Sequence, residues 1–183
     1  STGKNIIKHV KTDKNGKAEI KNLDIGKYIL RETKTRKEYK IALEQNITIE
    51  WGKTLNLTIE NEKMKGKVKI TKISEDDNLI TGEVAGTPIA NVKFEIYDDS
   101  GKLVDTLITK TDGIAISKDL VVGKYIVKEK ETGEYYEINE NDFEVEITKN
   151  GEVVGLTISN KSKTPPPEKP KEETPKIEVP PIE

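Results

Sequence analysis

Alternating apolar and polar residues predict β-strands along most of the chain. The pattern is clearest in residues 68–72, 92–97, 125–129, 143–147 and 156–160. Successive side chains of a strand point to opposite faces, so a half-buried strand shows a period of two. Turn-forming sequences such as Lys14-Asn15-Gly16 and Lys149-Asn150-Gly151 separate the strands, and residues 74–91 form a predicted loop. No segment has the apolar stripe of an amphipathic helix, so we predict an all-β protein built from β-sandwiches.

The chain contains an internal repeat with a spacing of about 97–99 residues. Residues 26–32 (GKYILRE) match residues 123–129 (GKYIVKE), and residues 57–61 (LTIEN) match residues 156–160 (LTISN). The first copy begins at the equivalent of Ser100, so it lacks a counterpart of everything before that point. We therefore expect the first domain to be truncated at its N-terminus.

The repeat and the composition together predict three segments. Residues 1–62 form the truncated domain and residues 63–162 the complete one. Residues 163–183 contain every proline except Pro88, mixed with Lys and Glu. Such a composition cannot build a core, so this segment is predicted to be a stalk, either disordered or in polyproline II conformation.

Composition narrows the classes of function. Basic residues number 31 and acidic residues 33, and aromatic residues make up only 5 % of the chain, so we expect no nucleic-acid partner. No apolar run is long enough to cross a bilayer, and membrane insertion of this segment is not expected. There is no cysteine and only one histidine, His9, which argues against disulfides, a metal site and a cofactor.

Three polar residues fall on the apolar faces of their predicted strands: Lys72, Glu129 and Asn160. Their same-face neighbours are Val68 and Ile70, Tyr125 and Val127, and Leu156 and Ile158. Taken singly, each could be a solvated residue at a strand end. However, the Glu and the Asn recur in the first copy as Glu32 and Asn61, in the same register. Unpaired groups of this kind would be costly in a core, so we expect them to interact.

Together these groups can form an intramolecular isopeptide bond. The Lys72 amine would attack the Asn160 carboxamide, Glu129 would carry protons, and ammonia would leave. Burial lowers the pKa of a lysine amine and so supplies the neutral nucleophile, while a buried Glu that holds a proton can polarise the Asn carbonyl. Folding supplies proximity, worth roughly 7–11 kcal/mol of the barrier. The reaction happens once per chain, so we do not expect an enzyme.

These residues resemble the Cna protein B-type (prealbumin-like) domains of Gram-positive surface proteins and pilins. The resemblance rests on three motifs: the early strand Lys69-Ile70-Thr71-Lys72, the strand Gly-Lys-Tyr-x-x-x-Glu and the final Ile-x-Asn. Residues 28–33 (YILRET) are also similar to the pilin E-box, although residues 34–39 (KTRKEY) depart from the sequence that usually follows it. The resemblance covers residues 1–162, the first domain only in part.

The resemblance implies tandem immunoglobulin-like, prealbumin-like β-sandwiches in a stalk or spacer module of a cell-wall-anchored adhesin or pilus protein. Such a module would lie outside the bacterial cell, with the neighbouring domains of its own surface protein as partners. The alternative is a module that itself binds a host matrix protein or glycan, which exposed aromatic residues would favour. The single Trp, Trp51, is predicted to pack at a strand end instead.

A further hypothesis concerns the first domain. Without the lysine strand its sheet would have an open edge, to which a peptide strand could add and then bond to Asn61.

Overall fold

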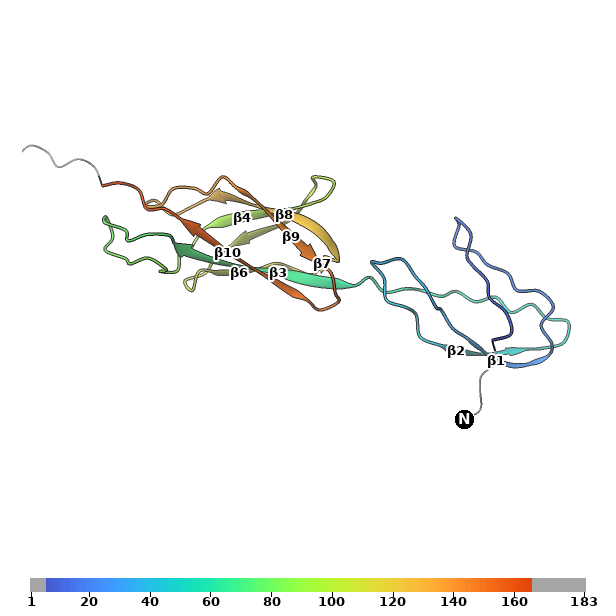
Figure 1. The fold of residues 1–183 in the computed structure, drawn as a ribbon. Coiled ribbons are helices and arrows are strands. Elements are labelled where there is room, and N and C mark those ends of the chain that lie inside the picture. Colours follow the sequence, from blue (N-terminus) through green and yellow to red (C-terminus); the bar gives the residue numbers. More distant parts are fainter. Residues whose placement is uncertain (1–5, 166–183) are drawn as a thin grey trace, which may run out of the picture. The chain divides into compact units, whose positions relative to one another are not determined.

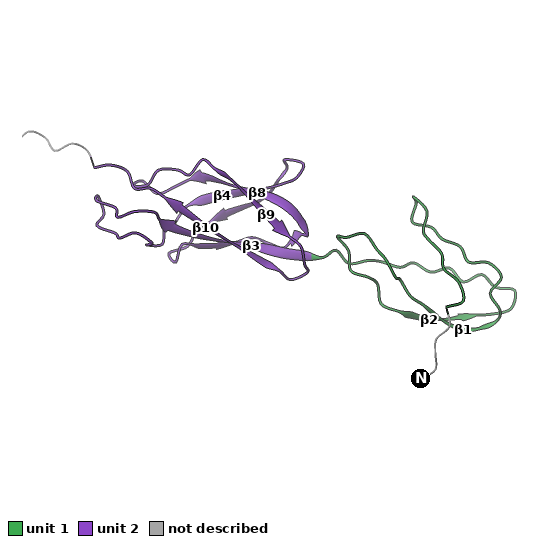
Figure 2. Cartoon of the chain, viewed as in Figure 1, with its two compact units in different colours: residues 1–64 green, residues 65–183 purple. Residues whose placement is uncertain are grey.

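The computed structural model of the 183-residue chain describes residues 6–165. These residues form strands, turns and loops, with no helix among them, so the all-β prediction is confirmed. The chain divides into two compact units, unit 1 (Ser1–Met64) and unit 2 (Lys65–Glu183), which are coloured in Figure 2. Residues 166–183, which contain most of the predicted proline-rich stalk, lie outside the described residues.

Unit 2 is a sandwich of two sheets. Its eight strands are β3 (Lys65–Ser74), β4 (Lys93–Asp98), β5 (Leu103–Ile108), β6 (Ile114–Ile116), β7 (Leu120–Val121), β8 (Gly123–Glu131), β9 (Asp142–Ile147) and β10 (Val153–Asn160). One sheet has the order β10-β3-β6, with β7 also pairing to β3, and the other has the order β5-β4-β8-β9 (Figure 1). The five strands predicted in this part of the sequence all form, with bounds that differ by a few residues.

The core of unit 2 lies between these sheets. In β3 every second residue from Gly66 to Ser74 is buried, as expected of a strand with one face in the core. Burial of each large apolar side chain is worth roughly 1.5–3 kcal/mol. The core residues are Val68, Ile70, Ile89, Val92, Phe94, Ile96, Leu107, Ala115, Leu120, Tyr125, Val127, Tyr136, Val145, Ile147 and Ile158.

The first and last strands of unit 2 are neighbours. In Figure 1, β10 runs beside β3, and the two strands are parallel, with Lys72 opposite Ile158 and Ser74 opposite Asn160. Two parallel neighbouring strands need a long connection between them, and here strands β4 to β9 form that connection. Residues at the two ends of unit 2 therefore share one sheet and one face.

Unit 1 has much less regular structure. Its strands β1 (Gly26–Leu30) and β2 (Gln45–Ile49) form one antiparallel ladder, and Tyr39 and Lys63 form an isolated bridge. None of its described residues is buried. Eleven of its large apolar side chains are exposed: Ile6, Ile7, Val10, Ile25, Ile29, Ile41, Leu43, Trp51, Leu55, Leu57 and Ile59.

Residues 57–61, which the repeat matches to the predicted strand of residues 156–160, do not form a strand. In unit 2 the matching residues lie in β10 and pair with β3, but unit 1 has no described strand beside residues 57–61. A strand needs a hydrogen-bonded neighbour, so an apolar alternation alone is not sufficient. By contrast, β1 forms where the same repeat predicts a strand.

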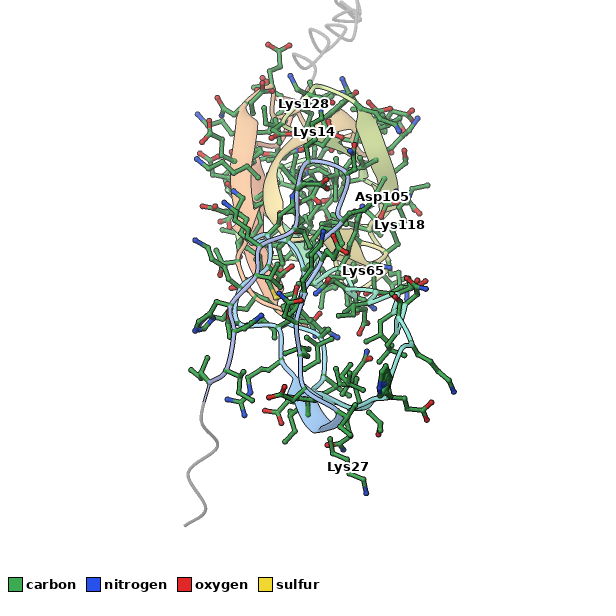
Figure 3. The ribbon with its side chains drawn as sticks, turned by 90° about the vertical axis from the view of Figure 1, so that its right-hand side faces the viewer. Lys14, Lys27, Lys65, Asp105, Lys118 and Lys128 are labelled. Carbon is green, nitrogen blue, oxygen red and sulfur yellow. The ribbon has the colours of Figure 1, made fainter. Side chains whose placement is uncertain are left out.

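Ion pairs between acidic and basic side chains are scattered over the surface of unit 2. Figure 3 labels Asp105 and Lys118, whose Oδ1 and Nζ atoms are 4.0 Å apart. Lys128 Nζ lies 2.8 Å from Asp142 Oδ2. Exposed pairs of this kind contribute little to stability. Within residues 6–165 there is no helix of the length and apolarity that a bilayer span requires, and no cluster of three or more His, Cys, Asp and Glu side chains that could hold a metal ion.

Candidate functional site

Lys72, Glu129 and Asn160 meet inside the core of unit 2. Lys72 stands two residues before the end of β3 and Asn160 at the last position of β10, both in one sheet. Glu129 comes from β8 in the opposite sheet and reaches them across the sandwich. All three are buried, and Lys72 is completely inaccessible to solvent. The period-two assignment of these side chains to the core agrees with the structure.

The three side chains form a closed set of hydrogen bonds. Lys72 Nζ donates to Glu129 Oε2 over 2.9 Å and also to Asn160 Oδ1. Asn160 Nδ2 donates to Glu129 Oε1 over 2.5 Å. The Glu129 carboxyl group therefore contacts both nitrogens, that of the amine and that of the amide. No buried side-chain nitrogen or oxygen atom in residues 6–165 is left without a partner.

The arrangement differs from the expected one in one respect. Glu129 was expected to hydrogen-bond the carbonyl oxygen of Asn160, but that oxygen accepts from Lys72 and the carboxyl group faces the amide nitrogen instead. This arrangement matches donors with acceptors, because the amine N–H groups donate to the Oδ1 atom and a carboxyl oxygen accepts from Nδ2. One carboxyl oxygen thus faces the nitrogen that would lose a proton, and the other faces the nitrogen that would leave.

Burial lowers the pKa of the Lys72 amine. Loss of solvation is the largest cause, and it outweighs the hydrogen bond and the charge of Glu129, which both raise the pKa. The Phe94 ring, whose centre is 5.9 Å from Nζ, closes the apolar side of the site. The lowered pKa makes the neutral amine, the form in which a lysine is a nucleophile, easier to reach than in an exposed lysine.

Sequence reasoning missed one residue of the site, Thr132. Its hydroxyl oxygen accepts a hydrogen bond from Asn160 Nδ2 over 2.8 Å and so helps to orient the amide. The internal repeat carries a signal for it, because Thr35 stands three residues after Glu32 just as Thr132 stands three residues after Glu129. A search for residues that both copies share close to the candidate glutamate would have identified Thr132.

The backbone around Lys72 is fixed from both sides. Its amide nitrogen donates to Gly113 O over 2.8 Å, and its carbonyl oxygen accepts from Ile89 N over 3.0 Å. Gly113 has a φ of +70°, and a Cβ atom there would overlap the Lys72 carbonyl oxygen and come within 3.0 Å of Pro88 Cβ. Only glycine fits this contact, which holds Lys72 in place along β3.

Unit 1 brings together Glu32 and Asn61, the counterparts of Glu129 and Asn160. Asn61 Nδ2 donates to Glu32 Oε2 over 2.6 Å and to the Lys40 carbonyl oxygen over 2.8 Å. Both side chains are half-buried. The Lys40 amine turns away and pairs with Glu62 at 2.8 Å. Within the described residues, no lysine amine is hydrogen-bonded to Glu32 or Asn61.

The packing prediction for Trp51 is wrong. Trp51 follows β2, as expected, but it is 75 % exposed. It lies beside a shallow surface depression that Leu23, Ile25 and Ile49 also line. A side chain of this size packs only where there is a core to receive it, and the described part of unit 1 has none.

Comparison with known proteins identifies the family of the chain. Residues 1–63 and 66–162 match the SpaA family of prealbumin-like fold domains, and the chain belongs to this family. It is related to Gram-positive pilins and surface proteins. The match covers both units and includes Lys72, Glu129 and Asn160.

Three proteins are similar to this chain in sequence or in structure. The trypsin-resistant surface T6 protein of Streptococcus pyogenes serotype M6 is 33 % identical over 81 residues, which are 44 % of this chain and 15 % of that protein. The structure of the Bacillus anthracis TIE protein matches with a TM-score of 0.72 and 33 % identity, over 84 % of this chain and 28 % of that one. The minor pilin GBS52 of Streptococcus agalactiae matches with a TM-score of 0.47 and 23 % identity, over 87 % and 69 %. The chain thus spans a minor part of the first two relatives.

Proposed function

We propose that the chain is a stalk or spacer module of a cell-wall-anchored surface adhesin or pilus protein, stabilised by a self-catalysed isopeptide bond between Lys72 and Asn160. In this proposal residues 1–62 and residues 63–162 are two successive domains of the module, and the proline-rich residues 163–183 act as a spacer. The observation that carries the proposal is the closed, buried triad of an amine, a carboxyl group and a carboxamide, in which every polar atom has a partner.

The geometry supports a simple sequence of proton transfers. The neutral Lys72 Nζ attacks Cγ of Asn160 and gives up a proton to Oε2 of Glu129, 2.9 Å away. Oε1 of Glu129, which faces Nδ2 over 2.5 Å, returns a proton to the amide nitrogen. The Nζ–Cγ bond forms, the Cγ–Nδ2 bond breaks and one ammonia leaves. The product stays in place, so each chain reacts once and no external cofactor takes part.

The place of the module outside the cell is inferred from its relatives. The Streptococcus pyogenes relative is named as a surface protein, and the chain is related to Gram-positive pilins and surface proteins. We infer that the chain occupies the same setting, with the neighbouring domains of its own surface protein as partners. The absence of cysteine is consistent with a crosslink that does not depend on redox conditions.

The intact mass of the purified chain tests the bond. We expect a mass about 17 Da below that of the unmodified sequence, which is the loss of one ammonia. Glu129→Gln keeps the shape of the side chain but removes the proton acceptor, so this variant should have its full sequence mass. Glu144→Gln, at an exposed position in β9, is the matched control and should lose ammonia like the native chain. A native chain with its full sequence mass would overturn the proposal.

The alternative, a module that binds a host protein or glycan, has one observation in its favour. Trp51 is exposed beside apolar residues, as ligand-contacting aromatic side chains often are. Trp51→Ala should abolish adhesion to immobilised matrix proteins or glycans if this module binds them. If the native chain and Trp51→Ala adhere equally, or if neither adheres, the binding function is rejected and only the stalk function remains.

A further inference from the structure

Thr132 contacts the reacting carboxamide but takes no part in the proton transfers described above. It directly follows β8, and its hydroxyl oxygen accepts a hydrogen bond from Asn160 Nδ2 over 2.8 Å. In the proposed reaction Nδ2 is the nitrogen that leaves as ammonia. The contact can therefore serve either the finished fold or the reaction, and these two roles have different consequences.

The Asn160 carboxamide is held at each of its polar atoms. Its Oδ1 atom accepts from Lys72, and Nδ2 donates to Glu129 Oε1 over 2.5 Å as well as to Thr132. An amide nitrogen has two N–H donors, so both are used. To attack Cγ, the amine must leave Oδ1. The two hydrogen bonds of Nδ2 then remain to hold the plane of the amide.

The hydrogen bond between Asn160 and Thr132 belongs to the state before the reaction. In the product the nitrogen bonded to Cγ is Nζ of Lys72, because Nδ2 has left. Thr132 then has no Nδ2 atom from which to accept a hydrogen bond. This contact therefore cannot stabilise the crosslinked domain, whereas it can act on the rate at which the crosslink forms.

Thr132 also connects the buried site with solvent. Lys72, Glu129 and Asn160 are only 0 %, 5 % and 2 % exposed, whereas Thr132 is half-buried. The pairing of β8 with β4 ends at Glu131, the residue before it. Ammonia that stays beside the new amide can attack it and reverse the reaction, so it has to leave the core. Of the two side chains bonded to Nδ2, Thr132 is the one that reaches the surface.

We propose that Thr132 holds the leaving nitrogen of Asn160 during the attack and forms the route by which ammonia reaches solvent. This inference rests on the proposed function. The Nζ–Cγ bond forms, the Cγ–Nδ2 bond breaks, and Glu129 carries one proton from Nζ to Nδ2. The Thr132 hydroxyl group keeps its own proton throughout. Branching at Cβ restricts the rotation of a threonine side chain, which suits a group that has to hold another in place.

The rate of ammonia loss tests this role. The full chain and its variants are made by cell-free synthesis, translation is stopped, and samples denatured at intervals are analysed for the fraction that is about 17 Da lighter. Thr132→Val keeps the shape but removes the acceptor, and the rate should fall about threefold to tenfold, the effect of one hydrogen bond. Thr132→Ser should recover most of the native rate. Thr106→Val, at an exposed position in β5, is the matched control and should react like the native chain.

Two further measurements separate this role from structural damage. The crosslinked form of Thr132→Val should unfold at the same denaturant concentration as the crosslinked native chain. The rates of both proteins should also rise with pH over the same range, because the hydrogen bonds of the Lys72 amine are to Glu129 and Asn160. A loosened site would admit water and raise the pKa of the amine toward 10.5, which would shift the profile to higher pH.

Thr132→Leu tests the route to solvent, because leucine lacks the acceptor as valine does and fills more space. It should react more slowly than Thr132→Val, with a crosslinked form that unfolds like the native one. Equal rates for these two variants would overturn the route.

The remaining outcomes separate this inference from the proposed function. Equal rates for Thr132→Val and the native chain would overturn the role of Thr132 and retain the crosslink. A lower unfolding midpoint of crosslinked Thr132→Val would assign Thr132 to the fold and overturn the inference in the same way. A native chain that keeps its full sequence mass would overturn both.

Discussion

Lys72 and Asn160 lie on adjacent parallel strands, two positions apart in register, with both side chains on the core face. Ile158 of β10 lies opposite Lys72, and Asn160 follows Ile158 by two positions, so it points to the same face of the sheet. The amine donates to the amide oxygen, and Glu129 reaches both residues from the opposite sheet. The site is thus defined by strand pairing, and changes that disturb the pairing or the amine should have distinct effects.

Removal of the amine should lower the stability of unit 2. A crosslink that closes a loop of about 90 residues is worth roughly 4–5 kcal/mol in the chain-entropy model. Lys72→Met fills the same space but leaves the buried Glu129 carboxyl group without its amine partner, which is destabilising in itself. We expect the free energy of unfolding of Lys72→Met, measured by denaturant titration, to fall by at least the contribution of the crosslink.

Lys69→Met provides the matched control, because Lys69 lies on the other face of the same strand and is only partly buried. Its stability should stay within about 0.5 kcal/mol of the native value. Equal unfolding midpoints for the Lys69 and Lys72 variants would contradict a stabilising bond.

The pH dependence of stability should report the lowered pKa of Lys72. In Asn160→Ala the bond cannot form, so the buried amine remains free to titrate. Because its pKa is below the ordinary value of 10.5, the unfolded state binds more protons than the folded state between the two pKa values. Stability should therefore rise with pH in that window, by at most about 1.4 kcal/mol per pH unit, and fall as pH decreases through it.

The double variant Lys72→Met, Asn160→Ala isolates this contribution from those of the other titrating groups. Urea midpoints of the two proteins should be measured across the alkaline range. The midpoint of Asn160→Ala should fall below that of the double variant as the pH decreases. Parallel curves would show that the amine titrates alike in both states.

Gly113→Ala should disturb the site through the backbone. The added Cβ atom would overlap the Lys72 carbonyl oxygen, in addition to the strain of a φ of +70°. Gly101→Ala is the matched control, since Gly101 has a φ of +80° and open space around it. We expect Gly113→Ala to cost about 1–3 kcal/mol more than the control and to leave part of the chain without the ammonia loss in intact-mass spectra. An identical effect of the two substitutions would mean that only the backbone strain of a positive φ matters, and not the contact with the Lys72 carbonyl oxygen.

Unit 1 should be cleaved by proteases before unit 2. None of its described residues is buried, so its local opening costs little, whereas unit 2 encloses a complete core. Limited trypsin digestion of the full chain should remove peptides of residues 1–64 first and leave a resistant fragment that contains residues 72–160. Simultaneous loss of both units would indicate that unit 1 is as stable as unit 2.

Much of the site could be predicted from period-two alternation. The faces of Lys72, Glu129 and Asn160 follow directly from their apolar neighbours, and the repeat of Glu32 and Asn61 marked two of them as more than surface residues. The parallel pairing of β3 with β10 could not be deduced in this way, because alternation fixes a face but not a neighbour.

The failures in unit 1 have one physical cause. Residues 57–61 alternate as well as residues 156–160 do, and Trp51 is as apolar as a core residue should be. Both predictions assumed that a partner surface exists. Local pattern specifies which side of a segment should be buried, whereas burial itself depends on strands elsewhere in the sequence.

The parallel neighbours β3 and β10 also determine how far the chain can extend when its ends are pulled apart. Lys72 and Asn160 are 88 positions apart in the sequence, a stretch that would span about 300 Å if drawn straight. With the proposed bond in place, tension passes from β3 to β10 directly, and the intervening segment never becomes slack chain. A tether built from such units would keep its working length under sudden pulls, whereas one without the bond would lengthen by roughly that amount with each unit that opened.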